Sequence, residues 1–114
     1  MSILSDLVNT IKTLNIPIET GYFSDKPPSE YIVLTPLIDS FELYADNGPL
    51  NQVEELRISL FTKNNYINLK NQLARILLGA GFIITDRRYL GFEDDTKYHH
   101  YVIDVMKEYE MEGI

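Results

Sequence analysis

Residues 53–78, VEELRISLFTKNNYINLKNQLARILL, decide the fold because the apolar spacing changes within them. From Val53 to Lys63 apolar and polar residues alternate, which is typical of a strand with one buried face. Asn64 and Asn65 end this strand and provide side chains that can cap a helix from about Tyr66 to Leu78. The apolar residues of that helix recur at helical spacing and are predicted to form its buried face: Ile67, Leu69, Leu73, Ile76, Leu77 and Ala80.

The rest of the chain provides one more helix and four more strands. The helix is predicted from Ile3 to Leu14 and ends before Pro17, because the residue before a proline is disfavoured in helical geometry. Pro36 marks a strand edge or a bulge, and glycines at 79 and 81 terminate the second helix. The remaining strands are predicted over residues 16–23, 31–35, 82 to about 92, and 98–108.

The order helix–strand–strand–strand–helix–strand–strand predicts an α+β fold. Short turns favour a mostly antiparallel sheet, and the two α-helices can cover one of its faces. At 114 residues, the chain is expected to form a single domain over 1–114.

Composition excludes several classes of protein. The chain contains no cysteine, which excludes disulfide scaffolds, thiol catalysis and cysteine-bound zinc. Its net charge of −7 disfavours nonspecific electrostatic binding to nucleic acid or to an anionic membrane. No apolar run approaches the roughly 18 residues of a membrane span, and the N-terminus does not resemble a signal peptide.

The strongest candidate for a metal site lies in residues 93–100, where His99 and His100 follow Glu93, Asp94 and Asp95. Histidine and carboxylate are common metal ligands. Adjacent strand residues point to opposite faces, however, so the two histidines should not chelate one ion. A solvated acidic turn is therefore favoured, and a metal-binding enzyme is kept as an alternative.

No other motif indicates catalysis or a cofactor. There is no Gly-x-Ser-x-Gly turn, and Gly79-Ala80-Gly81 ends a helix instead of opening one, which is the wrong end for phosphate. Arg87 and Arg88 are expected to form a local ion pair with Glu93 or Asp104 instead of binding nucleic acid. We therefore expect no enzyme activity, no catalytic residue, no cofactor and no metal.

A protein interface is the favoured kind of site. An extended loop is expected around 39–52, and it combines possible anchor side chains with turn residues. The candidate contact residues in it are Phe41, Glu42, Tyr44, Asp46, Asn47 and Leu50. An ordinary hairpin connection explains the same residues. The eight tyrosines of the chain suit either a sheet surface or an interface.

The order of segments resembles the small tail-completion, or tail-terminator, proteins of long-tailed bacteriophages and prophages. The resemblance covers nearly the whole chain, and its motifs are diffuse. The segments that carry it are Tyr31-Ile32-Val33, Tyr44-Ala45-Asp46-Asn47, the strand Leu56 to Lys63, Gly79-Ala80-Gly81-Phe82, and Tyr98-His99-His100-Tyr101.

This resemblance implies a structural role without catalysis or cofactor. It implies a ring, typically a hexamer, that caps the tail tube protein and joins it to the head–tail connector protein. DNA would pass through the lumen without specific binding, and no membrane would be involved. The protein would assemble in the host cytoplasm and end at the head-proximal end of the virion tail. A small acidic protein-interaction module remains the alternative.

Overall fold

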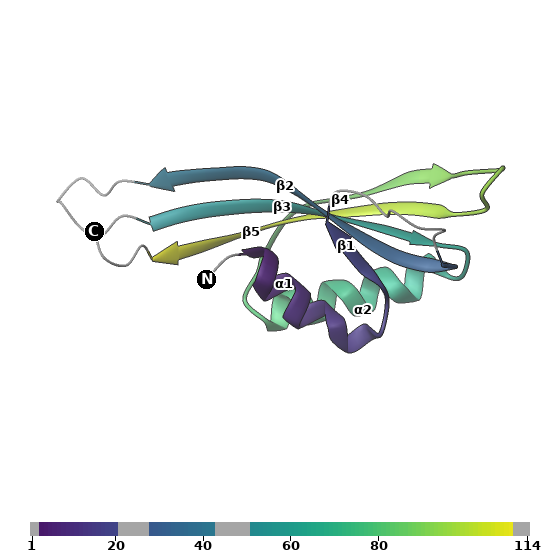
Figure 1. Cartoon of the computed structure of the whole chain (residues 1–114), viewed down its shortest axis with the longest axis horizontal. Coiled ribbons are helices and arrows are strands. Elements are labelled where there is room, and N and C mark those ends of the chain that lie inside the picture. Colours follow the sequence, from purple (N-terminus) through teal and green to yellow (C-terminus); the bar gives the residue numbers. More distant parts are fainter. Residues whose placement is uncertain (1–2, 21–27, 43–50, 111–114) are drawn as a thin grey trace.

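A computed structural model describes residues 3–20, 28–42 and 51–110 of the chain (Figure 1). Two helices, a short 3-10 turn and five strands follow one another along it. They are α1 (Ile3–Ile11), η1 (Lys12–Leu14), β1 (Ile18–Thr20), β2 (Glu30–Glu42), β3 (Asn51–Thr62), α2 (Tyr66–Gly79), β4 (Ile83–Phe92) and β5 (His99–Glu110). Both predicted helices and all five predicted strands are thus present, and the α+β fold is confirmed.

The five strands form one sheet in the order β1-β2-β3-β5-β4. Strand β1 runs parallel to β2, whereas every other neighbouring pair is antiparallel. Strand β5 is inserted between β3 and β4, so the last strand of the chain is internal. The two edges of the sheet are therefore formed by β1 on one side and β4 on the other.

Both helices cover the same face of the sheet, and the core lies between them and β2, β3 and β5 (Figure 1). Asn65 caps α2 as predicted, because its side-chain oxygen accepts the Ile67 backbone N–H at 3.0 Å. Gly81 follows the helix with φ +91°, which glycine adopts readily. The fully buried side chains are Leu7, Ile11, Ile32, Leu34, Leu56, Ile58, Leu60, Leu73, Leu77, Ile103, Val105 and Thr62.

Strand β2 is longer than expected and corrects the predicted loop around 39–52. Residues 39–42 belong to β2 and residues 51–52 to β3, and the rest of the predicted loop lies outside the described residues. The register of β2 on β3 shifts between Pro36 and Ile38, and this bulge lets the strand continue past the proline. Residues 37–42 show no clean alternation, so their strand structure follows from pairing with β3 instead of from periodicity.

The molecule is elongated, with principal extents of 54 × 26 × 23 Å. Its radius of gyration is 15.7 Å, whereas a compact chain of this length is expected at about 13 Å. The Ile3 backbone N–H donates to Glu54, which places the start of α1 beside that position of β3. Beyond it, residues 40–42, 51–53 and 108–110 continue as three paired strands past the helices, and we call them the arm (Figure 1).

In the described part of the chain, neither helix has the length and apolar character needed to cross a membrane.

Candidate interaction surfaces

The predicted contact residues lie at or beyond the end of the arm. The backbones of Phe41 and Glu42 pair with Gln52 and Asn51 of β3, at the last two pairs of the β2–β3 ladder. The other four candidates, Tyr44, Asp46, Asn47 and Leu50, lie outside the described residues. Their role as an interface stays a prediction.

The face of the sheet opposite the helices is organised in three rows across the strands. The central row contains the small residues Val33, Ser59 and Val102, which pair in register on β2, β3 and β5. They are buried although no helix covers them. Longer side chains in the neighbouring rows flank them, aromatic on one side and charged on the other.

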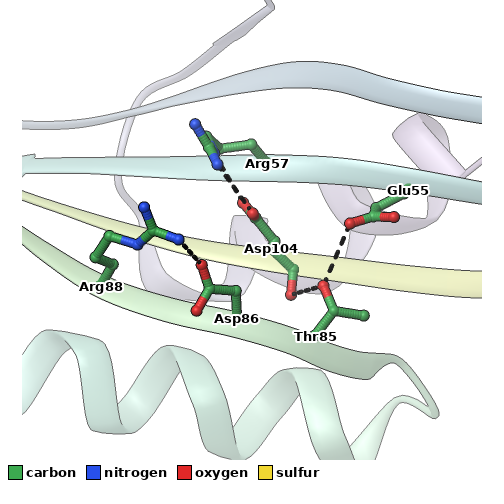
Figure 2. Close-up of polar contacts among 6 residues, drawn as sticks. All are labelled: Glu55, Arg57, Thr85, Asp86, Arg88 and Asp104. Atoms are coloured by element: carbon green, nitrogen blue, oxygen red, sulfur yellow. Dashed lines mark hydrogen bonds and ion pairs between the residues drawn. The ribbon is translucent and has the colours of Figure 1, made fainter.

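The charged row centres on an ion pair between neighbouring strands (Figure 2). Arg57 of β3 donates from Nε and from a terminal nitrogen to the two carboxylate oxygens of Asp104 on β5, at 2.8 and 3.0 Å. The carboxylate raises the pKa of Arg57 further above its ordinary value through this hydrogen bond and its negative charge. The Asp104 side chain is 8% exposed and that of Arg57 37%, so the arginine lies between a nearly buried anion and solvent.

Strand β4 extends this row toward its own edge (Figure 2). Arg88 donates to Asp86 at 2.6 Å, and the two side chains are 62% and 38% exposed. Thr85 donates to the backbone carbonyl of Asp104 at 3.2 Å and contacts Glu55 at 3.4 Å. The prediction that Arg87 or Arg88 pairs with Glu93 or Asp104 is wrong, because Arg57 occupies Asp104 and Arg88 pairs two residues away along its own strand.

The aromatic row lies at the other end of the same face. The Tyr31 and Phe61 rings stack at 4.6 Å between centroids, and Phe61 stacks on His100 at 4.1 Å. Burial lowers the pKa of His100, whose buried Nε2 has no hydrogen-bond partner in the described structure. Burial also raises the pKa of Tyr31, and the nearby Tyr98 and Glu93 act in the same direction. The directions of these pKa shifts keep the Tyr31 and His100 rings uncharged near pH 7.

A second aromatic cluster lies on the helix side of the sheet. Tyr66, the first residue of α2, stacks on Tyr89 of β4 at 4.7 Å and lies 5.2 Å from the ring of His99. The Tyr89 hydroxyl and His99 Nδ1 are 3.0 Å apart, within hydrogen-bond distance. His99 and His100 thus face opposite sides of the sheet, as predicted. No group of three or more potential ligand residues that could hold a metal ion occurs among the described residues.

Strand β4 presents the most apolar exposed surface. Eight large apolar side chains are exposed in the described part of the chain, and four of them are on this single edge strand. The four are 42% to 52% exposed: Ile83, Tyr89, Leu90 and Phe92. Because an exposed apolar edge strand can pair with another chain, this edge is a candidate contact surface.

Sequence reasoning did not single out this edge. Its signal is present in residues 83–92, where apolar residues occupy both parities of the strand, at 83 and 84 and again at 89 and 90. A half-buried strand needs apolar residues on one parity only. Without the strand order, however, this pattern is equally compatible with an internal strand covered on both faces.

Comparison with known proteins identifies no family for this chain. Neither a protein-family model nor a curated protein matches the chain. Among solved structures, the chain is similar to one described as "Virion of native gene transfer agent (GTA) particle". The two are 10% identical, 92% of this chain and 84% of that chain are covered, and the TM-score is 0.48. No function is taken from this likeness.

Proposed function

We propose that this chain is a structural assembly protein of a phage-like particle, with no reaction and no cofactor of its own. The observation that carries the proposal is the apolar edge strand β4, whose exposed side chains would be buried by contact with another protein. An elongated sheet with open edges on opposite sides is a suitable building block for repeated lateral contacts. When one surface of a subunit binds a different surface of the next copy, the assembly closes into a ring if the rotation between neighbouring copies divides a full turn.

In its finer form, the proposal is a tail terminator. The resemblance stated above supports a ring, typically a hexamer, which caps the tail tube protein and contacts the head–tail connector protein. The net charge of −7 suits a ring through which DNA passes without specific binding, because an acidic surface offers no counterion-release gain. The protein would act in the host cytoplasm and remain at the head-proximal end of the virion tail.

Particle size and tube capping test this proposal in two steps. Light scattering over a range of concentrations, with negative-stain imaging, is expected to show rings of one size. Tail tubes built from the tube protein encoded in the same genome are then expected to stop growing and to carry a ring at one end. Rings that do not bind tail tubes would be consistent with an assembly role and would refute the tail-terminator function.

The alternative gives a different result in the same experiment. A chain that stays monomeric at every concentration, ignores tubes and binds another protein would favour the small acidic interaction module. In that case the apolar β4 edge would be covered by that partner instead of by the particle.

A further inference from the structure

The two edges of the sheet differ in charge. Strand β4 carries Asp86, Arg87 and Arg88 within ten residues. Helix α2, which packs against β4, adds Lys70 and Arg75 and no acidic residue. Four basic residues and one acidic residue therefore lie on α2 and β4, in a chain whose net charge is −7. This side of the molecule is basic, and the remainder is strongly acidic.

The opposite edge is acidic and incompletely paired. Strand β1 pairs with β2 only through Ile18–Thr20 and Ile32–Leu34. Past that point, residues 35–42 of β2 have no second partner strand among the described residues. In sequence, β1 and this open part of β2 contain Glu19, Asp39 and Glu42 and no basic residue.

We propose that the β4 edge of one copy binds the β1–β2 edge of a second copy, head to tail. The strand directions allow this pairing, because β1 and β2 run opposite to β4 within the sheet. A second copy repeated around a rotation axis therefore presents β1 antiparallel to β4, and the sheet continues from one subunit to the next. The inference rests on the proposed assembly role and specifies the contact that builds it.

The bulges of β4 limit the length of this contact. The β4–β5 register shifts between Ile84 and Asp86 and again between Tyr89 and Gly91. Between the two shifts only Asp86–Tyr89 is regular strand, and this length suits the three residues of β1. The bulges thus restrict uncontrolled edge pairing to one short segment.

Charge disfavours the symmetric alternative, in which two β4 strands pair with each other. That arrangement brings Arg87 and Arg88 of both copies to one seam, and Asp86 is already bound to Arg88 at 2.6 Å. Arg88 and Glu19 are both exposed and lie on the same face of the sheet, opposite the helices, because they pair with Val102 and Val33 of the central row. Head-to-tail pairing brings Glu19 of one copy beside Arg88 of the next, on the same face of the continued sheet.

Cross-linking tests the geometry directly because the chain contains no cysteine. Two full-length variants, Arg88→Cys and Glu19→Cys, are treated with a short bis-maleimide, separately and mixed. Cross-linked dimers are expected in the mixture and not in either variant alone. Dimers formed by Arg88→Cys alone would show β4 pairing with β4 and overturn the proposal.

Charge reversal provides the second measurement. Arg88→Glu and Glu19→Arg are each expected to weaken self-association about tenfold at low salt, since each replaces an attraction by a repulsion. The double variant is expected to recover to within about threefold of the original chain. The matched control, Arg75→Glu on the outer face of α2, changes the net charge equally and should leave association unchanged. Failure of the double variant to recover would overturn the pairing.

The outcomes separate this contact from the proposed function. Rings that form without the mixed cross-link would overturn the contact and leave the assembly role. The mixed cross-link without rings or tube capping would establish the contact and refute the tail terminator. A monomer that gives no cross-link, with or without tubes, would overturn both.

Discussion

Removing Arg57 and removing Asp104 from their ion pair should lower the free energy of unfolding by different amounts. The Asp104 side chain is 8% exposed and Arg57 is 37% exposed. Arg57→Met leaves a nearly buried carboxylate without the two hydrogen bonds it accepts, and we expect a loss of about 2–3 kcal/mol in the free energy of unfolding. Asp104→Asn keeps an acceptor and leaves an arginine that can turn to solvent, so about 1 kcal/mol is expected.

Urea unfolding at pH 7, followed by circular dichroism, measures the free energy of unfolding of each variant. It also gives the dependence of that free energy on urea concentration, which should be the same for all variants if they unfold by the same transition. The matched control is Arg88→Met, which removes an arginine–aspartate pair on the same face in which both partners are exposed. It should cost less than about 0.5 kcal/mol. Equal costs for Arg57→Met and Asp104→Asn, or a larger cost for Asp104→Asn, would refute the reasoning from burial.

Three further predictions concern other parts of the molecule. Because burial lowers the folded-state pKa of His100, the unfolded chain takes up the proton first. The free energy of unfolding should therefore decrease as the pH falls below about 6.5, and His100→Phe should remove this component in pH-dependent urea titrations. Leu73→Ala in the core should cost about 2–5 kcal/mol, whereas Leu78→Ala, on the exposed face of the same helix, should cost less than about 0.5 kcal/mol by thermal unfolding. Substituting Tyr44 and Asp46 with alanine should weaken ring assembly in light scattering without changing the melting temperature, and a loss of folding would instead make them core residues.

Local patterns predicted the elements well, and the reason is visible at particular residues. Asn65 caps α2 through a hydrogen bond to a backbone group two residues away, so a short sequence window contains the whole interaction. Alternation in residues 53–63 likewise identified the buried face of β3, because neighbouring strand residues must point to opposite sides. Leu56, Ile58 and Leu60 are fully buried, as that alternation predicts.

Pairing between distant strands was less accessible from sequence. Pro36 interrupts the strand pattern in the sequence. In the structure, the register with β3 shifts after Pro36 and pairing then resumes, so β2 extends to Glu42. Arg57 and Asp104 are 47 residues apart, and no local rule pairs them in preference to Arg88 and Asp104. Their contact depends on β5 lying beside β3.

Local patterns were sufficient to predict the two helices, the positions of the strands and the α+β class. These properties follow from side-chain periodicity and capping, which act over a few residues. The same patterns also placed Leu69, Leu73 and Leu77 in the core correctly, but Ile67 and Ala80, predicted on the same buried face, are exposed. The position of β5 between β3 and β4, and the open β4 edge with its apolar side chains, could be recognised only in the assembled sheet. Strand order depends on which of several non-local strand pairings is most stable. The edge strand, and with it the candidate contact surface, is therefore defined only when the whole sheet has formed.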